Sequence, residues 1–525
     1  MRILKTVNGL SCYLNHRRYL PSKGWTEQLT VGLVPTMGNL HRGHQSLIDR
    51  ARRENDLVVV SIFINPIQFA PGEDLATYPQ TPMEDLEICE QVGVDAVFIP
   101  TVSELYGSSQ PDGDKITRVV PPSPMLAVLC GPHRPGHFEG VATVVTKLLS
   151  LVSPHRTYLG LKDAQQVAIL QQVAADLHLP GELVPCPTVR DRDGLALSSR
   201  NRYLSPSQRA QATTLYQGLK AAQSLFKAGE RHRSVLTATV KHHLAQVPAL
   251  TLEYVDLVHP HSLVPLEQVE SVGLLGVAAY LGKTRLIDNL VLRHRKPIVA
   301  IDGPAGAGKS TVARQVAQRL NLLYLDSGAM YRAIAWKALD LGLDPEDEVA
   351  MAELVQSCEL RLATTGDDPA WAAYPSRLWL NGQEVTELIR RPAVTEKVST
   401  IAAQPMVRQT LLDQQRQYGV AGGVVMEGRD IGTQVFPGAE LKVFLTASVG
   451  ERARRRWNDL QGQQQASGSL EELERAIADR DHQDSTRRVA PLRKANDALE
   501  LNTDGLGIEA VVDQIVTWFH ARVES

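Results

Sequence analysis

Cysteine is scarce and scattered in this chain of 525 residues, and its scarcity excludes two kinds of architecture. The cysteines are odd in number and show no CxxC spacing, so we expect neither a structural zinc site nor a disulfide framework. They are Cys12, Cys89, Cys130, Cys186 and Cys358.

Long apolar runs and an excess of one charge are also absent. No run approaches the roughly eighteen apolar residues that suggest a membrane-spanning helix, and the N-terminal residues lack the apolar core of a signal peptide. The net charge of −3 creates no global attraction to nucleic acid or to an anionic membrane. We therefore expect a cytoplasmic protein with neither membrane nor nucleic acid among its partners.

Two different nucleotide-binding motifs are present. Residues Gly303–Ser310 match the GxxxxGK[ST] phosphate loop, and His41-Arg-Gly-His44 lies far upstream in the same chain. A chain of this length exceeds the size at which a single hydrophobic core stops growing. The sequence therefore predicts two enzymes joined end to end, each using ATP.

The first part alternates strand-like and helix-like segments. Apolar strand-like runs at 31–35, 57–64 and 95–100 alternate with helical stretches at 43–54 and 83–92, which is typical of a parallel sheet covered on both faces. We expect a loop at 121–136 and a helix at 141–151. Residues 1–185 are thus predicted to form a Rossmann-like domain that binds ATP and an acid substrate.

The pattern changes after Arg200. A helical stretch at 207–225 is followed by strand-like runs at 252–258, 272–280 and 286–292. These predict a small α+β lid domain over 186–292. The junction at 294–297 is only a few residues long and has no Gly/Ser tract, so we expect the two halves to abut.

His41 and His44 are three residues apart at the start of a predicted helix, so they share a face. A helix N-terminus attracts phosphate, and imidazoles placed there can donate hydrogen bonds to the charge that develops as pyrophosphate leaves. Alternatively, they are surface histidines at a helix cap. Further polar side chains follow other predicted strands and favour a site; they are Asn65, Gln68, Lys162, Asp163, Gln166, Ser198, Ser199 and Arg200.

Several longer strings resemble those of pantothenate synthetase. They are Val34-Pro-Thr-Met-Gly-Asn-Leu-His41-Arg-Gly-His44, Ser61-Ile-Phe-Ile-Asn65-Pro-Ile-Gln68-Phe, Arg134-Pro-Gly-His-Phe138, Asp193-Gly-Leu-Ala-Leu-Ser-Ser-Arg200-Asn and Leu286-Ile-Asp-Asn289. The resemblance covers residues 1–292. It implies that ATP activates (R)-pantoate as pantoyl adenylate, releasing pyrophosphate, and that β-alanine then displaces AMP.

The resemblance also implies roles for individual residues. His41, His44 and Lys162 are implied to be catalytic, with Asn65, Gln68 and Gln166 at pantoate and β-alanine, Asp163 at the ribose, and Mg²⁺ bridging phosphates. The implied ATP site comprises Met37, Gly38, His41, His44, Gly160, Lys162, Asp163, Val189, Leu197, Ser198, Ser199 and Arg200. Leu159, Leu161 and Ala164 depart from the family pattern, which bears on substrate affinity more than on the reaction. The family also implies a homodimer formed through this part.

In the second part, the phosphate loop follows a strand-like run at 298–301 and opens a helix predicted over 309–320. Its glycines turn backbone N–H groups toward phosphates; Lys309 reaches the terminal phosphates and Ser310 can bind Mg²⁺. The alternative is a chance pattern of glycines around a lysine. The predicted ATP residues are Gly303, Gly306, Gly308, Lys309, Ser310 and Thr311.

Charged residues gather farther along, at 451–456 and 479–488. They could be a solvated helical face or bind nucleic acid, but stacking aromatics are sparse and nearby acids offset the charge. A lid whose arginines close over the transferred phosphate accounts better for their position.

The strings Asp326-Ser-Gly-Ala-Met-Tyr-Arg332, Glu427-Gly-Arg-Asp-Ile-Gly432 and 490–497 resemble bacterial-type cytidylate kinase. The resemblance covers 296–523 and implies phosphoryl transfer from ATP to CMP or dCMP. It implies a P-loop nucleoside monophosphate kinase domain over 296–525, with an insert at about 333–420 and a lid at about 452–488. The implied CMP residues are Ser327, Arg332, Ser399, Arg408, Arg429, Asp430, Arg480, Asp484 and Arg487.

Other interpretations remain open at this point. The first part could be a generic nucleotidyltransferase, and the second a kinase for another metabolite, of which UMP is the nearest. The second part could also be a nucleotide sensor without turnover. Residues 363–375 match no usable motif, and 461–469 is predicted to be disordered.

Overall fold

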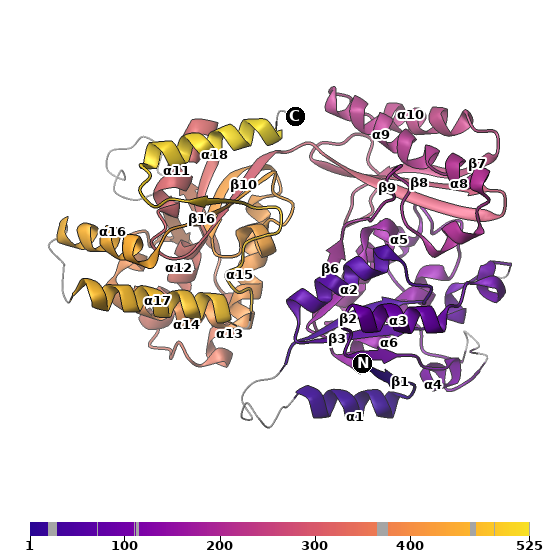
Figure 1. The fold of residues 1–525 in the computed structure, drawn as a ribbon, viewed down its shortest axis with the longest axis horizontal. Helices are drawn as coiled ribbons and strands as arrows, with labels where there is room; N and C mark the ends of the chain where they lie inside the picture. Colours follow the sequence, from indigo (N-terminus) through magenta and orange to yellow (C-terminus); the bar gives the residue numbers. More distant parts are fainter. Residues whose placement is uncertain are drawn as a thin grey trace. The chain divides into compact units, whose positions relative to one another are not determined.

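The structure is a computed structural model that describes residues 1–18, 29–70, 72–109, 111, 115–364, 376–462, 469–487 and 489–523. It comprises two compact units, Met1–His294 and Arg295–Ser525 (Figure 1). Two segments singled out in the sequence lie mostly outside the described residues. They are 363–375, which matches no motif, of which 365–375 is not described, and 461–469, predicted to be disordered, of which 463–468 is not described.

The first unit contains a parallel sheet and a smaller antiparallel one. Its strands are β1 (Arg2–Leu4), β2 (Val31–Thr36), β3 (Leu57–Ile62), β4 (Ala96–Phe98), β5 (Arg156–Gly160), β6 (Glu182–Cys186), β7 (Leu250–Val258), β8 (Val272–Leu281) and β9 (Thr284–Arg293). Its helices are α1 (Val7–Arg18), α2 (Arg42–Glu54), α3 (Pro82–Gln91), α4 (Val102–Tyr106), α5 (Ser123–Leu126), α6 (His137–Val152), α7 (Ala164–Asp176), α8 (Pro206–Gln211), α9 (Thr214–Lys227) and α10 (Arg233–Ala245). Short 3₁₀ turns are η2 (Pro66–Gln68), η3 (Asp74–Thr77), η4 (Leu161–Asp163) and η5 (Ser199–Tyr203).

The large sheet has the strand order β1-β4-β3-β2-β5-β6 and all its pairs are parallel. Alternate residues of β3 point to opposite faces: Val59 packs with residues of α1, α6 and α7, whereas Val58 and Val60 pack with residues of α2 and α3. Both faces are therefore buried, as the continuous apolar strands predict. The predicted α/β class is confirmed.

The small sheet β7-β8-β9 is antiparallel and packs with α9 and α10 around its own apolar core. The single helix predicted over 207–225 is wrong, because α8 and α9 are separate helices. The hydroxyl of Thr213 donates to the carbonyl of Ala210 at 2.8 Å, a local bond that competes with helical pairing at the break.

The loop predicted at 121–136 is also only partly right, since it contains the short helix α5. Gln165 of α7 anchors it. Its side-chain amide donates to the carbonyls of Met125 and Val128 and accepts the N–H of Cys130, at 2.8–3.0 Å. Buried amide bonds thus give this segment an order that its proline and glycine content does not suggest.

The second unit is built on a parallel sheet with the order β11-β15-β10-β16-β17. Its strands are β10 (Lys296–Asp302), β11 (Leu323–Asp326), β12 (Leu360–Thr364), β13 (Ser376–Leu380), β14 (Gln383–Glu384), β15 (Gly422–Gly428), β16 (Leu441–Thr446) and β17 (Leu499–Asn502). Its helices are α11 (Lys309–Leu320), α12 (Ser327–Asp340), α13 (Glu348–Gln356), α14 (Pro392–Ala403), α15 (Pro405–Tyr418), α16 (Val449–Gly462), α17 (Leu470–Thr486) and α18 (Ile508–Val523), with short turns η7 (Leu388–Arg390) and η8 (Ile431–Val435).

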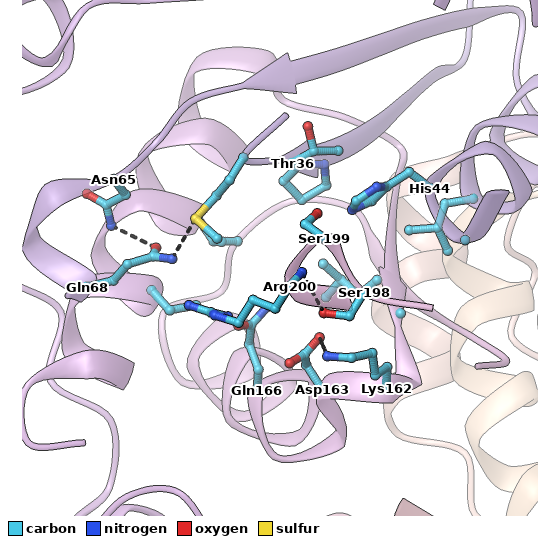
Figure 2. Close-up of a pocket in the computed structure, with 18 of the residues that line it drawn as sticks. Thr36, His44, Asn65, Gln68, Lys162, Asp163, Gln166, Ser198, Ser199 and Arg200 are labelled. Carbon is cyan, nitrogen blue, oxygen red and sulfur yellow. Dashed lines mark hydrogen bonds and ion pairs between the residues drawn. The ribbon is translucent and has the colours of Figure 1, made fainter. Parts of the chain in front are cut away.

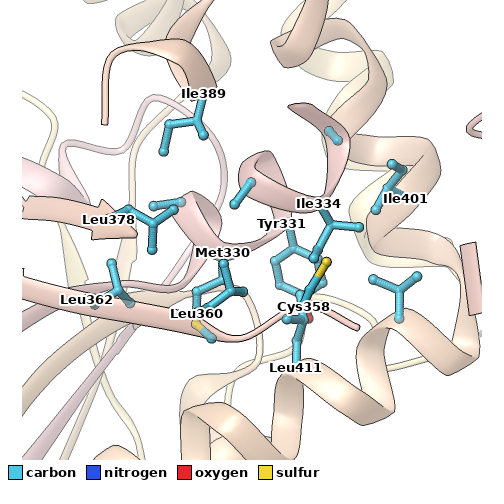
Figure 3. Close-up of a cluster of buried hydrophobic side chains, with 14 of the residues drawn as sticks. Met330, Tyr331, Ile334, Cys358, Leu360, Leu362, Leu378, Ile389, Ile401 and Leu411 are labelled. Carbon is cyan, nitrogen blue, oxygen red and sulfur yellow. The ribbon is translucent and has the colours of Figure 1, made fainter. Parts of the chain in front are cut away.

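The region predicted as an insert shares a core with this sheet rather than forming one of its own. Figure 3 shows Met330 of α12 beside Leu362 and Leu378 of the antiparallel sheet β12-β13-β14, and Ile334 of the same helix belongs to the same cluster. The same cluster includes Ile298 of the central strand β10. The insert region is therefore packed continuously onto the sheet that carries the phosphate loop.

All five cysteines are free thiols. Across the described parts of the chain, no helix combines the length and apolar character needed to cross a bilayer.

Candidate active sites

The first cavity lies at the carboxyl edge of the first unit's parallel sheet (Figure 2). Every residue predicted for this site lines it except Gly38. The lining ones are Met37, His41, His44, Asn65, Gln68, Gly160, Lys162, Asp163, Gln166, Val189, Leu197, Ser198, Ser199 and Arg200.

Gly38 is instead required for the backbone conformation of the turn. Its φ of +81° lies in the left-handed region, and a Cβ there would approach Asp85 Oδ2 to 2.9 Å. The carboxylate of Asp85, only 1% exposed, accepts the N–H groups of Asn39 at 2.9 Å and Leu40 at 2.7 Å. Asp85 therefore fixes the turn that leads into the two histidines, and sequence reasoning missed it.

The two imidazoles stack at the N-terminus of α2, with ring centroids 4.1 Å apart. His41 Nδ1 accepts the N–H of Gly43 at 3.1 Å, and His44 Nδ1 faces the N–H of His41 at 3.4 Å. Because Nδ1 accepts, the neutral rings carry their proton on Nε2. Burial, reinforced by the positive charge of Lys162, lowers the pKa of His41 to about 4 and that of His44 to about 3. Both are thus neutral donors at physiological pH.

Gln68 lies at the opposite end of the cavity in a network of amides. Its Oε1 accepts from Asn65 Nδ2 at 3.1 Å and its Nε2 approaches the sulfur of Met37 at 2.9 Å (Figure 2). Asn65 is 1% exposed and also bonds to Tyr106 Oη and the carbonyl of Gly140. Asn65 therefore supports Gln68, which is the amide available to a ligand.

A second set of side chains holds the backbone of Gln68. Two of them, Arg134 and His137, belong to a string that resembles pantothenate synthetase, but the sequence predicted no role for them. His137 Nδ1 lies 2.8 Å from the carbonyl of Gln68, and Arg134 Nη1 lies 2.9 Å from His137 Nε2. Arg134 is in turn held by both oxygens of Glu73, at 2.7 and 2.6 Å. Burial, with Arg134 adding to it, lowers the pKa of His137 to about 4, so the ring is neutral and donates from Nδ1.

Arg200, predicted to flank the triphosphate, is paired with Asp74 through two bonds of 2.9 and 2.8 Å. Ser198 Oγ accepts the N–H of Arg200 at 3.3 Å, and Ser199 Oγ donates to the carbonyl of Asn39 at 3.2 Å. Ser199 therefore joins the segment 198–200 to the histidine turn, whereas the bond of Ser198 lies within the segment. A phosphate would have to compete with Asp74 for the guanidinium.

Lys162 and Asp163 lie on η4 with their charged atoms 3.6 Å apart. The amide of Asn289, on β9, donates to the carbonyls of Leu161 and Lys162, both at 2.9 Å. Its neighbour Asp288 makes a two-pronged ion pair with Arg190. The α+β part of the unit thus positions Lys162 of the Rossmann-like part.

The second cavity opens at the carboxyl edge of the second unit's sheet. Every predicted kinase residue lines it except Gly303; the lining ones are Gly306, Gly308, Lys309, Ser310, Thr311, Ser327, Arg332, Ser399, Arg408, Arg429, Asp430, Arg480, Asp484 and Arg487. A Cβ on Gly303 would come within 2.1 Å of the carbonyl of Leu445. At Gly303, as at Gly38, a Cβ would collide with a neighbouring group. Glycine therefore allows the backbone to approach that neighbour closely at both positions.

Lys309 begins α11 and is 6% exposed, with its ammonium 2.6 Å from the carbonyl of Pro304 in the same loop. Burial lowers its pKa to about 7, with Arg429 acting in the same direction. The neighbouring Asp302 accepts the N–H groups of Ile431 and Gly432 at 2.8 and 2.7 Å, and burial raises its pKa to about 6. Asp302, which sequence reasoning did not identify, anchors the segment that follows Asp430.

Arginines and acids alternate around the part of this cavity formed by residues after β11, after β15 and on α17. Arg332 contacts Asp326 at 2.5 Å, Arg429 contacts Asp484 at 2.9 Å, and the buried Arg408 pairs with Asp430. Burial, with neighbouring arginines adding to it, lowers the pKa of both Arg480 and Arg487. An anion bound among these arginines would relieve their mutual repulsion.

The basic helix α16 divides its arginines between two roles. Arg454, Arg455 and Arg456 line the cavity, but Arg452 does not. The side chain of Arg452 is 4% exposed and turned into the protein. The prediction that this run of arginines closes over phosphate therefore fails for Arg452, which is occupied by hydrogen bonds to protein.

Two ATP sites of unrelated design occupy this chain. The first unit has the sheet, histidine turn and lysine of an ATP-dependent ligase of the nucleotidyltransferase type. The second has the sheet order, phosphate loop and arginine cluster of a P-loop nucleoside monophosphate kinase.

Comparison with known proteins identifies a family for each of the two units. The family model for pantoate-beta-alanine ligase matches residues 2–291 and that for cytidylate kinase matches 299–521. Over the whole chain, the bifunctional pantoate ligase/cytidylate kinase of Trichormus variabilis is 54% identical across 536 aligned residues, covering 100% of this chain and 99% of that protein. The protein of the same name from Synechococcus elongatus is 55% identical, covering 94% of this chain and 93% of its own.

Solved structures agree for the first unit. The pantothenate synthetase of Thermus thermophilus is 43% identical and superposes with a TM-score of 0.51, covering 56% of this chain and 100% of its own. The chain therefore belongs to the family of bifunctional pantoate ligases/cytidylate kinases. It is an ATP-using enzyme with a ligase and a phosphotransferase activity, and the interpretation of the second unit as a sensor without turnover is set aside.

Proposed function

We propose that the first unit makes pantothenate in two steps within the first cavity. The carboxylate of (R)-pantoate attacks the α-phosphate of ATP, giving pantoyl adenylate and pyrophosphate, and the amine of β-alanine then displaces AMP. The observation that carries this proposal is the placement of two neutral imidazoles and Lys162 around one cavity that is also lined by Gln68.

Each of these groups has a role that its chemistry supports. His41 and His44 donate from Nε2 to the phosphate oxygens that gain charge as pyrophosphate leaves, and Lys162 neutralises the same charge. Gln68 and Gln166 hold pantoate, and Asp163 holds the ribose. The remaining predicted ATP residues surround the nucleotide; they are Met37, Gly160, Val189, Leu197, Ser198, Ser199 and Arg200, with Gly38 shaping the turn.

The second unit transfers the γ-phosphate of ATP to CMP or dCMP, giving CDP or dCDP and ADP. The phosphate loop holds ATP through Lys309 and Ser310, and Arg332, Arg429, Arg480 and Arg487 hold the acceptor phosphate. Ser399, Arg408 and Asp430 read the base, and Ser327 and Asp484 lie toward the acceptor. Phosphoryl transfer needs positioning and charge neutralisation rather than a protein nucleophile.

The residues of the second cavity fit Mg²⁺, which prefers hard oxygen ligands and keeps several waters. The hydroxyl of Ser310 bonds to the carboxyl group of Glu427 and is exposed beside the phosphate loop. No preformed cluster of His, Cys, Asp or Glu suited to a metal occurs among the residues placed by the structure. Mg²⁺ carried by nucleotide phosphates, with Ser310 as a protein ligand, would neutralise their charge.

The proposal also includes the domain boundaries, the cellular location and the oligomeric state. We assign 1–185 to ATP and pantoate binding, 186–292 to the lid domain and 296–525 to the kinase, with the insert at 333–420 and the lid at 452–488. Five free thiols support a cytoplasmic location. A homodimer through the first unit rests on the family resemblance, and light scattering of the full chain tests it.

Two substitutions test the assignment of the sites. Lys309→Ala should abolish CDP formation and spare pantothenate formation, and His44→Ala should do the reverse. ³¹P NMR with Mg-ATP follows both reactions in one tube, since pantoate plus β-alanine yields AMP and pyrophosphate whereas CMP yields ADP and CDP. Loss of both activities from either variant would contradict the two-site assignment. If the wild-type protein formed AMP and pyrophosphate but no CDP, UMP would be tested next as the phosphate acceptor.

A further inference from the structure

Arg452 joins three elements of the second unit through its guanidinium group. Nε donates to the carbonyl of Ala447, just after β16, at 3.0 Å, and Nη1 donates to the carbonyl of Ala305, in the phosphate loop, at 2.9 Å. Nη2 donates to Asp481 Oδ2, on α17, at 2.5 Å. The side chain is 4% exposed, so these contacts are made largely out of water.

The two ends of this bridge belong to the two halves of the kinase site. Ala305 and Gly306 lie in the loop that receives ATP, and a Cβ on Gly306 would touch the Arg452 side chain at 3.3 Å. On α17, Asp481 directly follows Arg480 and lies one turn before Asp484, two of the residues of this helix that line the second cavity. A displacement of either end is therefore transmitted to the other through one rigid, planar group.

ATP binding should change the conformation of the phosphate loop. Lys309 donates to the carbonyl of Pro304, the residue before Ala305. A triphosphate competes for that ammonium, so Pro304 loses its partner and the adjoining peptide is free to change position. The carbonyl held by Arg452 belongs to the next residue along the chain.

We propose that Arg452 is a positioning residue that couples the two nucleotide sites of the kinase, so that ATP in the phosphate loop sets α17 for the acceptor nucleotide. The inference rests on the proposed function in one respect, the assignment of Arg480 and Asp484 to CMP. Arg452 itself touches neither nucleotide. Because coupling between binding sites is reciprocal, CMP must strengthen ATP binding by the same factor.

Equilibrium binding measures this coupling directly. The dissociation constant of CMP is determined by calorimetry with and without a saturating non-hydrolysable ATP analogue and Mg²⁺, and the ratio of the two values is the coupling factor. We expect a factor of about 10 for the wild-type full chain, within the usual range for coupled sites. The reverse experiment, titrating the analogue with and without CMP, should return the same factor.

Two variants remove the bridge in different ways. Asp481→Ala removes the acceptor on α17, and Arg452→Lys keeps the charge but cannot span three acceptors. In both, the coupling factor should fall below about 2, while the analogue alone still binds. Glu471→Ala is the matched control, because it removes an exposed acid from the same helix and should keep the wild-type factor.

The outcomes separate this inference from the proposed function. A wild-type factor of one, or an unchanged factor in Asp481→Ala, would overturn the coupling role of Arg452. Should Arg452→Lys fail to fold, Asp481→Ala decides alone. Arg480→Ala tests the CMP site itself and should weaken CMP binding with or without the analogue. Normal CMP binding by that variant would contradict the site assignment and not the measured coupling.

Discussion

The carboxylate of Asp85 accepts the backbone N–H of Leu40 at 2.7 Å, and through this contact α3 holds the turn that carries His41 and His44. The second oxygen of the same carboxylate receives the N–H of Asn39 at 2.9 Å. A buried side chain with no ligand contact therefore determines where the two imidazoles stand.

Replacing Asp85 by asparagine should impair the ligase without touching its substrates. The amide has a single acceptor oxygen and presents an N–H₂ group to a backbone donor, which costs about 1–3 kcal/mol. We expect kcat for pantothenate formation to fall about tenfold or more, with CDP formation unchanged. Glu84→Gln, an exposed neighbour on α3, is the control; an equal loss in that variant would contradict the explanation.

His137 should make the first unit less stable in mild acid. Its pKa is about 4 when folded and near 6.5 when unfolded, so between these values the unfolded chain binds more protons. The free energy of unfolding therefore falls as pH drops from 6.5 to 4, and His137 contributes about 2 kcal/mol of this loss between pH 7 and pH 5.

Hydrogen exchange of the α6 amides at the two pH values measures that loss within the first unit alone. His137→Gln, which keeps a donor for the carbonyl of Gln68, should show a dependence on pH that is smaller by this amount. An unchanged dependence would mean that His137 is protonated in the folded protein.

Lys309 should take up a proton when ATP binds. Its pKa of about 7 in the empty loop leaves it mostly neutral at pH 8, and a triphosphate favours the charged form. Calorimetry at pH 8 in two buffers with different ionisation enthalpies should report uptake of about one proton. Lys309→Arg, which is always charged, should show almost none; equal uptake in both proteins would assign the proton elsewhere.

Asn289 should matter to the ligase although it stands on β9, away from the histidine turn. Its amide satisfies the carbonyls of Leu161 and Lys162. Asn289→Asp sets a carboxylate against those carbonyls, so we expect pantothenate formation to fall about tenfold or more, in line with the cost of an unsatisfied buried group. The rate of CDP formation by the same sample is the internal control, and a parallel fall in both rates would indicate general damage.

The sequence predicted the elements whose signal is local. β3 is a run of β-branched and apolar residues interrupted only by Ser61, and α11 extends from Lys309 to Leu320 as the phosphate loop indicates. Thr213, where a predicted helix breaks, illustrates the limit: one hydroxyl bond to the preceding turn outweighs an apolar periodicity that looks continuous.

The supporting residues of both sites could not be predicted, because their signal is not local. Asp85 and Leu40 are 45 positions apart, Glu73 and Arg134 are 61 apart, and Asp302 and Ile431 are 129 apart. A lone acid on a helix has the same appearance in a sequence whether it faces water or a buried N–H. Arg452 was misread for a related reason, since a run of arginines does not reveal which one turns inward.

Among the residues that the structure describes, strands β1 to β9 all belong to the first unit and β10 to β17 all to the second, and no strand is exchanged between their sheets. Only His294 and Arg295 separate β9 from β10, the central strand of the second sheet. During synthesis, every strand of the ligase has therefore been made before the central strand of the kinase appears. Because domains generally fold as units from the N-terminal end, the ribosome delivers a chain in which the ligase can complete its fold while the kinase is still being translated.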